Sequence, residues 1–293
     1  MALTGAQVRG KIKNIAKSNR ADARILMRIY MMERFLERVA NSPYSENFII
    51  KGGILVTSMI GISMRSTMDI DTSIRNLNLS EEEALRIINK ISKIDLQDGV
   101  TFNVKDVTGI MDDMEYPGIR VTMDAYLGKM ITPIKIDIST GDIITPRAIE
   151  YDYSLMLEER SIKLWSYNLE TIFAEKLQTI LARGILNTRM RDFYDVYTLM
   201  LRNEERINHE ILKQAFEATC NKRNTTDIIT SGMQILDIII NDDRLNNLWN
   251  SYQQKYLYAR DIPFEAAVKK AIQIYKMMKH CLLYTSDAAD DLT

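Results

Sequence analysis

The pattern that most constrains this chain is a glycine pair followed, after a short apolar run, by two alternating aspartates. Lys51-Gly52-Gly53 comes directly after the apolar residues 48–50, and Asp69-Ile70-Asp71 follows the next apolar run. If residues 68–71 form a strand, Asp69 and Asp71 share one face of it and Met68 points from the other face into the core. The expected order is therefore strand, glycine turn, helix and Asp-x-Asp strand.

Paired carboxylates on one rigid element suit divalent cations. Mg²⁺ is commonly held by one or two carboxylates together with substrate phosphates. The bare backbone of Gly52-Gly53, placed between a strand and a helix, can approach a triphosphate closely. Each half of the pattern also has a plainer explanation, because an Asp-x-Asp is commonly a solvated strand end and a glycine pair a simple turn. Their order along the chain favours a nucleotidyltransferase site with two Mg²⁺ ions about 3.5–4 Å apart.

A third carboxylate lies in a segment of strict alternation. In residues 134–139 three isoleucines alternate with polar residues, which is the pattern of a half-buried strand. Asp137 falls on the polar face. It is predicted to complete a metal triad with Asp69 and Asp71 and to orient or deprotonate the acceptor hydroxyl.

Composition excludes several other classes of protein. The 293 residues are 46% hydrophobic and 26% charged, as in ordinary soluble globular proteins. The sequence contains no apolar run long enough for a membrane span and no signal-peptide pattern at its start. Two cysteines and two histidines are too few for a disulfide framework, a zinc cluster or a histidine-based site. The expected location is the cytoplasm.

The order of the predicted elements indicates an α+β fold. A helix is expected over about 6–40, strands over 48–50 and 68–71, and a helix between them over about 53–62. Ser80 and Glu83 form a capping box that opens the next helix. Antiparallel strands follow at about 101–107, 118–126 and 131–139, and helices fill 168–280. We predict an N-terminal helical segment over 1–42, a core over 43–165 and a helical C-terminal domain over 166–280.

Both ends of the chain have a biased composition. The first forty residues hold nine lysines and arginines against three acidic residues. Such a segment suits contact with an RNA backbone or an acidic partner, and equally a solvated helix face. Residues 281–293 resemble the translated adaptor of a sequencing library, so they are expected to be a disordered addition that takes no part in the fold.

A lysine interrupts the apolar face of the first predicted C-terminal helix. The apolar residues between positions 169 and 181 form one arc of the helical wheel, and Lys176 falls inside it. Burying an unpaired ammonium is costly, so Lys176 must either reach solvent or meet an anion, such as a nucleotide phosphate or a metal-site carboxylate. In the next helix Asp192 lies at the edge of the apolar face, and Asp195 is expected to point further outward. The arginines beside them are compatible with a helix-to-helix ion pair and with a substrate site.

These motifs resemble the AbiEii/AbiGii family of toxins, nucleotidyltransferase-like proteins of bacterial abortive-infection and type IV toxin–antitoxin systems. The resemblance covers about residues 48–200. It is carried in order by Lys51-Gly52-Gly53, Arg65-x-Thr67-x-Asp69-x-Asp71, Asp137, Ala174-Glu175-Lys176 and Arg191-Asp192-x-x-Asp195. It implies a polymerase-β-like nucleotidyltransferase core, a helical C-terminal domain, Mg²⁺ and an NTP substrate. It also implies a genetically linked winged-helix antitoxin, which need not bind the toxin.

The resemblance assigns expected roles to individual residues. Asp69 and Asp71 would bind the metal ions, and either Asp192 or Asp195 would form the far wall of the nucleotide site. The chain departs from broader nucleotidyltransferases in having Gly52-Gly53 where they have Gly-Ser, so it offers no serine hydroxyl to the phosphate. The residues expected to bind the nucleotide are Lys51, Gly52, Gly53, Thr67, Lys176, Asp192 and Asp195.

The leading prediction is a toxin that transfers a nucleotide from an NTP to RNA, with a tRNA 3′ end as the preferred acceptor. An adenylyltransferase that modifies an antibiotic or a protein would use the same carboxylates. A non-catalytic GTP-binding module of a toxin–antitoxin system is the third alternative. Lys176→Met is predicted to keep or raise stability and to lower nucleotide transfer by about tenfold or more.

Overall fold

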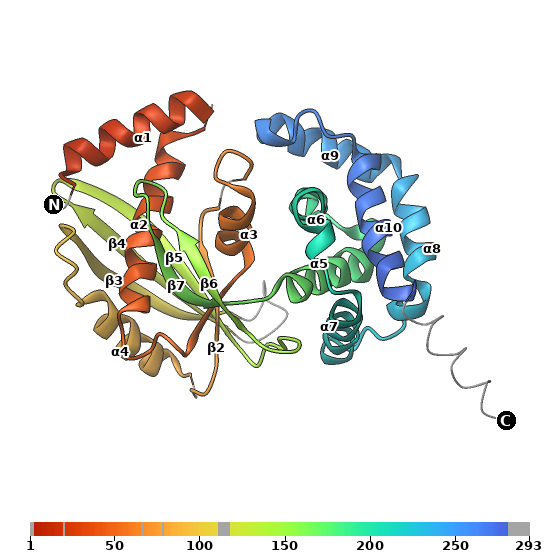
Figure 1. Ribbon diagram of the computed structural model, residues 1–293, viewed down its shortest axis with the longest axis horizontal. Coiled ribbons are helices and arrows are strands. Elements are labelled where there is room, and N and C mark those ends of the chain that lie inside the picture. Colours follow the sequence, from red (N-terminus) through yellow and green to blue (C-terminus); the bar gives the residue numbers. More distant parts are fainter. Residues whose placement is uncertain (1–2, 20, 66, 78, 111–117, 281–293) are drawn as a thin grey trace. The chain divides into compact units, whose positions relative to one another are not determined.

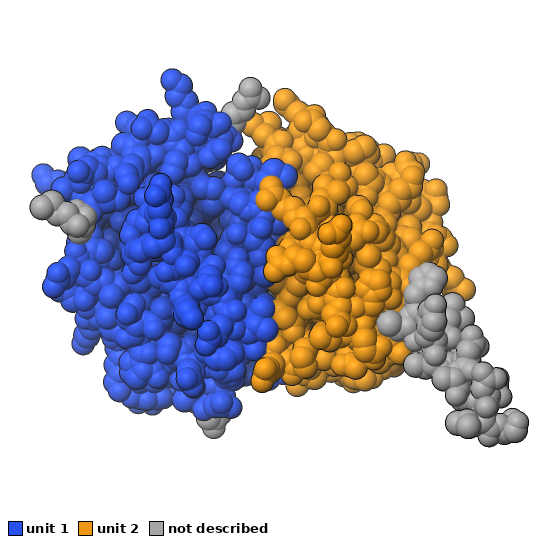
Figure 2. Space-filling view, in the orientation of Figure 1, with its two compact units in different colours: residues 1–142, 148–167 blue, residues 143–147, 168–293 orange. Residues whose placement is uncertain are grey.

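A computed structural model describes residues 3–19, 21–65, 67–77, 79–110 and 118–280 of the chain. Contacts between Cα atoms divide it into two units, which are coloured separately in Figure 2. Unit 1 comprises residues 1–142 and 148–167, and unit 2 comprises residues 143–147 and 168–293. The proposed adaptor-derived tail, 281–293, lies outside the described residues.

A mixed β-sheet forms the centre of unit 1 (Figure 1). Among the described residues it has seven strands in the order β3-β4-β5-β2-β1-β7-β6. The β2–β5 and β1–β7 pairs are parallel and the other neighbours are antiparallel. The predicted α+β class is thereby confirmed. The strands are β1 (Phe48–Lys51), β2 (Ile70–Ile74), β3 (Val100–Ile110), β4 (Gly118–Leu127), β5 (Met130–Thr140), β6 (Ile149–Ser154) and β7 (Ser161–Ser166).

One face of this sheet packs against helices. Helix α2 (Ala23–Ala40) contacts β5 and β7, and α4 (Glu81–Ser92) contacts β3 and β4. Along β5, Ile134, Ile136 and Ile138 are buried while Lys135 is exposed, as the alternation predicts. The polar positions of β5 therefore lie on the opposite face. Helix α1 (Gly5–Asn19) packs against α2, and α3 (Gly52–Ile60) packs against β1 and β2.

Two predicted elements differ from the structure at their ends. The single helix expected over 6–40 is two helices, because Asp22 caps α2 by accepting a 2.7 Å hydrogen bond from the Arg24 amide. Strand β2 begins at Ile70 instead of residue 68. Met68 and Asp69 therefore precede the strand, and Met68 is 40% exposed instead of buried in the core.

The hairpin β6–β7 was not predicted. Among the described strands it adjoins β1, which pairs with β7 in parallel through Ile49 and Ile50. The three strands predicted at 101–107, 118–126 and 131–139 are confirmed, and β3 extends furthest beyond its predicted range. They form the antiparallel run β3-β4-β5.

The described part of unit 2 after Asn168 is helical up to His280, as predicted. Asn168 caps its first helix by accepting a 2.8 Å hydrogen bond from the Thr171 amide. None of the helices in the described part of the chain is both long and apolar enough to cross a membrane. The helices are α5 (Leu169–Arg183), α6 (Met190–Asn203), α7 (His209–Lys222), α8 (Ile228–Ile240), α9 (Asp243–Lys255) and α10 (Phe264–His280), with short 3₁₀ turns at Gly184–Leu186, Glu204–Arg206 and Leu257–Ala259.

Candidate functional site

The turn from β1 into α3 brings the glycine pair against a carboxylate. Gly52 adopts a φ of +57°, and a Cβ at this position would lie 2.2 Å from Asp71 Oδ2. The Gly53 amide donates a 2.9 Å hydrogen bond to the same oxygen. A Cβ on Gly53 would lie 2.4 Å from Thr67 Oγ1. Both glycines are thus required because Asp71 and Thr67 pack directly on the backbone.

Strand register places four charged residues in one row across the sheet. Asp71 is paired with Lys51 of β1 on one side and with Asp137 of β5 on the other. Asp137 is paired in turn with Arg120 of β4. Because register partners point to the same side of a sheet, the row reads cation, carboxylate, carboxylate, cation. The structure therefore brings Asp71 and Asp137 together as the sequence predicts.

Asp69 adds a third carboxylate beside this row. It lies in the bend before β2 and is half-buried. Burial raises the pKa of Asp69, and the negative charges of Asp71 and Asp137 raise it further. Burial also raises the pKa of Asp71, against the opposing effects of the Gly53 amide and the Lys51 ammonium. Negative charge is therefore concentrated here and incompletely neutralised by the protein.

Arg65 is hydrogen-bonded to the Gly52-Gly53 turn and to the helix that follows it. Its side chain is 2% exposed, and Nη1 donates to the Gly53 carbonyl at 2.8 Å and to Thr57 Oγ1 at 3.1 Å. Thr67 is also buried, and its hydroxyl donates to the Asp69 carbonyl at 3.2 Å. The segment that precedes β2 is thus fixed against the start of α3. The predicted role of Thr67 in nucleotide binding stays a prediction.

Lys51 forms a buried ion pair. Its Nζ lies 2.7 Å from Asp142 Oδ2 and 5.7 Å from the centre of the Tyr167 ring. Burial alone would raise the pKa of Asp142, but Lys51 and a hydrogen bond from Ser139 lower it overall. The predicted contact between Lys51 and a nucleotide would therefore have to compete with Asp142, which the sequence reasoning missed.

The residues present fit a divalent cation held by two carboxylates. No cluster of three or more acidic, histidine or cysteine side chains within the described ranges has the geometry of a complete metal site. Asp69 and Asp71 still offer oxygen ligands where negative charge is concentrated, and Mg²⁺ commonly takes its remaining ligands from phosphates and water. Asp137 is engaged elsewhere, because both its oxygens accept 2.8 Å hydrogen bonds from Arg120.

Unit 2 contains the second group of predicted residues. Lys176 Nζ on α5 lies 3.0 Å from Asp192 Oδ1 and 2.6 Å from Asp195 Oδ2, both on α6. Asp195 is fully buried, so the prediction that it points outward is wrong. It turns inward because the Lys176 ammonium lies between the helices. Arg189 Nε approaches Asp192 Oδ2 to 2.9 Å without hydrogen-bond alignment.

The anion that Lys176 requires is therefore supplied by the chain itself. Its side chain is 13% exposed, and the two aspartates satisfy its charge without a nucleotide. The same contacts join α5 to α6. The helix-to-helix pair that the sequence allowed for the neighbouring arginines is not the contact seen for Arg189, which approaches Asp192 within the start of α6. Roles for Lys176, Asp192 and Asp195 in nucleotide binding stay predictions.

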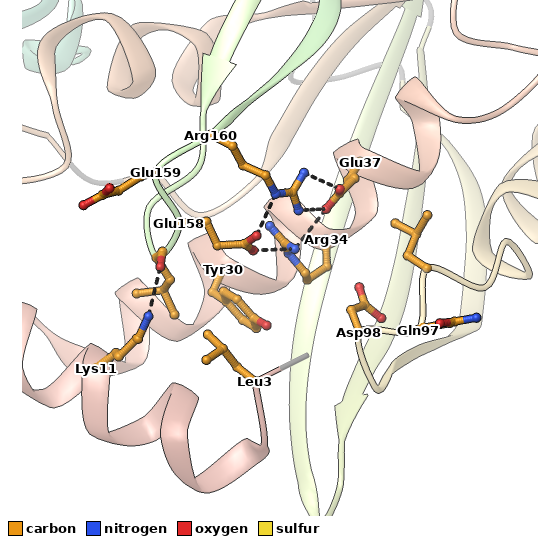
Figure 3. Close-up of a pocket in the computed structure, with 12 residues that line it drawn as sticks. Leu3, Lys11, Tyr30, Arg34, Glu37, Gln97, Asp98, Glu158, Glu159 and Arg160 are labelled. Atoms are coloured by element: carbon orange, nitrogen blue, oxygen red, sulfur yellow. Dashed lines mark hydrogen bonds and ion pairs between the residues drawn. The ribbon is translucent and has the colours of Figure 1, made fainter. Parts of the chain in front are cut away.

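A separate cavity of about 750 Å³ lies in unit 1 beside α1 and α2 (Figure 3). Arg34 Nη1 lies 2.9 Å from an oxygen of both Glu37 and Glu158. Arg160 contacts the same two glutamates, at 2.6 Å and 2.7 Å. The four charges cancel, and no motif along the chain predicts this network. Arg34 is therefore buried in ion pairs and does not present its charge to solvent, although it is one of the basic residues of the N-terminal segment.

Comparison with known proteins identifies the relatives of this fold. A proposed nucleotidyltransferase from Helicobacter pylori superimposes with a TM-score of 0.53 at 16% identity, covering 88% of this chain and 97% of that one. JHP933 from H. pylori superimposes with a TM-score of 0.51 at 15% identity, covering 92% and 97%. These likenesses show a shared fold. No curated protein matches the chain significantly.

The family model described as "Nucleotidyl transferase AbiEii toxin, Type IV TA system" matches residues 34–270. The match spans the carboxylates of unit 1 and the lysine–aspartate cluster of unit 2. Membership of a type IV toxin–antitoxin family implies an antitoxin as the genetic partner. The resemblance carried by the sequence motifs is thereby confirmed, and the chain belongs to the AbiEii family of nucleotidyltransferase toxins.

Proposed function

We propose that this nucleotidyltransferase toxin transfers a nucleotide from an NTP to RNA, with a tRNA 3′ end as the acceptor and Mg²⁺ as the required cation. The observation that carries the proposal is the pair Asp69 and Asp71 beside the Gly52-Gly53 turn. Burial, and after it the negative charge of Asp71, raises the pKa of Asp69, so a divalent cation bound here would relieve an unfavourable concentration of negative charge.

In the proposed reaction the acceptor hydroxyl oxygen attacks the α-phosphorus of the NTP. A new oxygen–phosphorus bond forms, the bond to the β-phosphate oxygen breaks and pyrophosphate leaves. The hydroxyl proton passes to a base, for which Asp137 is our candidate. Asp69 and Asp71 would hold the cation, which supplies electrostatic stabilisation of the phosphate oxygens when bound. The chain itself would thus contribute positioning and charge.

The surface of α1 supports RNA as the acceptor class. Arg9, Lys13 and Lys17 are exposed on this helix, and its sequence contains no acidic residue. By contrast, Arg34 and Arg38 of α2 are buried in ion pairs. The basic character of the N-terminal segment is thus presented to solvent mainly by α1, where it can attract a phosphate backbone.

Incubation with total tRNA, Mg²⁺ and each α-labelled NTP in turn tests the proposal. We expect label in intact tRNA with the wild-type protein and none with Asp71→Asn, which keeps the size of the side chain but removes its charge. Label on the protein itself or on an added aminoglycoside would establish the adenylyltransferase alternative. Absence of label on any acceptor, with intact tRNA present, would overturn the transferase proposal and favour a nucleotide-binding module.

A further inference from the structure

Asp137 is hydrogen-bonded to Arg120 in the structure, which does not match its proposed role as a base. It is 7% exposed, and both its oxygens are held by Arg120 Nε and Nη2 at 2.8 Å. This is the paired, planar arrangement in which an arginine binds a carboxylate most strongly. A carboxylate held in this way offers neither a metal ligand nor a free base. The three acidic groups consequently do not act together in this state.

The position of Arg120 makes this pairing a feature of the fold. Arg120 is the direct register partner of Asp137 across β4 and β5, so the backbone places the two side chains next to each other. The next carboxylate in the row, Asp71, is the register partner of Asp137 on the other side. Asp137 thus lies between a guanidinium and the carboxylates that would bind the cation.

We propose that Arg120 and the divalent cation compete for Asp137. In the resting protein Arg120 withholds this carboxylate, and cation binding at Asp69 and Asp71 becomes complete only when the Arg120–Asp137 pair opens. Arg120 is then a positioning residue that sets how tightly the cation binds in the absence of nucleotide. This inference rests on the proposed function, since it assumes that Asp69 and Asp71 bind a divalent cation.

The competition predicts that one substitution strengthens cation binding. Arg120→Gln removes the paired hydrogen bonds to Asp137 and releases this carboxylate. Mn²⁺, used as a probe for Mg²⁺, should then bind at least about fivefold more tightly. The free Mn²⁺ signal in electron paramagnetic resonance measures this directly, without nucleotide or RNA. Arg120→Lys keeps the positive charge but cannot donate two parallel hydrogen bonds to Asp137. The Mn²⁺ affinity of this variant should lie between those of the wild type and Arg120→Gln.

Removal of any nearby positive charge strengthens cation binding to some degree, so Lys135→Gln is the matched control. Lys135 is exposed on the same strand two residues before Asp137, and both Lys135 and Arg120 lower the pKa of Asp69 through their charge. Each substitution is therefore also made together with Asp137→Asn. The gain from Arg120→Gln should disappear in this background, whereas any gain from Lys135→Gln should persist.

Three results would overturn the inference. These are unchanged or weaker Mn²⁺ binding by both Arg120 variants, a gain from Arg120→Gln that survives Asp137→Asn, and absence of Mn²⁺ binding by every variant. Thermal unfolding confirms that each variant is folded, and Arg120→Lys decides the outcome if Arg120→Gln does not fold. Nucleotide transfer is measured separately, so a protein that transfers nucleotides but lacks the coupling would retain the proposed function and lose this inference.

Discussion

At the scale of single residues, the candidate site depends on how closely side chains approach the backbone at Gly52. We predict that Gly52→Ala destabilises the protein by about 2–3 kcal/mol, since the new Cβ would collide with Asp71 in a backbone conformation that is itself unfavourable. Gly128→Ala is the matched control, because Gly128 has a similar φ of +59° with nothing within 4 Å of the added Cβ. It should cost only about 1 kcal/mol. Urea unfolding measures both, and equal losses would show that the contact with Asp71 is unimportant.

The contacts of Lys176 reverse one prediction made from the sequence. Lys176→Met was expected to be neutral or stabilising, but it would leave Asp192 and Asp195 buried without their shared counter-ion. We now expect a loss of about 3 kcal/mol in unfolding free energy. The double variant Lys176→Met/Asp195→Asn removes one of the opposing charges and should recover much of this loss. If Lys176→Met melts at the wild-type temperature, the ion cluster has no structural importance.

Glu33 predicts a dependence of stability on pH. Burial raises its pKa to about 8, although the Met156 amide 3.0 Å from Oε1 opposes the shift. The folded protein therefore keeps a proton that the unfolded chain releases near its ordinary pKa of 4.5. This contribution to stability is complete below the unfolded pKa and is lost as pH rises toward 8, by at most about 1.4 kcal/mol per pH unit.

Glu33→Gln isolates this effect, because an amide cannot ionise and can still accept the Met156 hydrogen bond. Unfolding free energies measured by urea between pH 5.5 and 8 should fall more steeply for the wild type than for the variant. The crowded Asp69 and Asp71 add the same slope to both proteins, so they cancel in the comparison. Parallel pH profiles would contradict the assignment of a protonated Glu33.

At the scale of elements, local sequence signals predicted most of the fold. The alternation in residues 134–139 and the cap at Ser80 are interactions between near neighbours, and both are present as β5 and the start of α4. The hairpin β6–β7 was missed although Ile162 and Leu164 alternate with polar residues along β7, which is a local strand signal. Its place in the sheet beside β1, more than a hundred residues earlier, has no such local signal. The same limit applies to Arg120, whose importance follows from register with Asp137 and is invisible along the chain.

Removal of the capping side chain at a helix start is predicted to lower the stability of the protein. Ser80 accepts one hydrogen bond from the Glu83 amide at 3.1 Å, so Ser80→Ala should cost about 1 kcal/mol. Asn168 caps α5 and also donates to the Thr145 carbonyl at 2.6 Å, which attaches residues 143–147 to unit 2. Asn168→Ala should therefore cost about 2–3 kcal/mol, because it leaves buried groups without partners. Equal effects in chemical unfolding would mean that the Thr145 contact adds nothing.

At the scale of the whole molecule, the candidate residues divide between two units of the chain. Asp69, Asp71 and Asp137 belong to unit 1, whereas Lys176 belongs to unit 2. The sequence predicted a change from sheet to helix near residue 166, and the contact-based division also assigns residues 143–147 to the helical unit. Residues 143–147 belong to unit 2 because of contacts such as the hydrogen bond from Asn168 to the Thr145 carbonyl. No sequence pattern predicts such contacts. The proposed domain bounds stay predictions.

Asp69 and Asp71 are proposed to support nucleotide transfer to the 3′ end of tRNA. The most direct measurement is mass spectrometry of the 3′-terminal tRNA fragment after incubation with protein, Mg²⁺ and the four NTPs. We predict an added nucleotide with the wild-type protein, and at least about a hundredfold less with Asp71→Asn, equivalent to about 2.7 kcal/mol of lost transition-state stabilisation. Asp124→Asn, a half-buried aspartate on β4, is the matched control and should retain transfer. Unchanged tRNA with the wild-type protein would contradict the proposed transfer, and equal addition by Asp71→Asn would contradict the role of Asp71 in it.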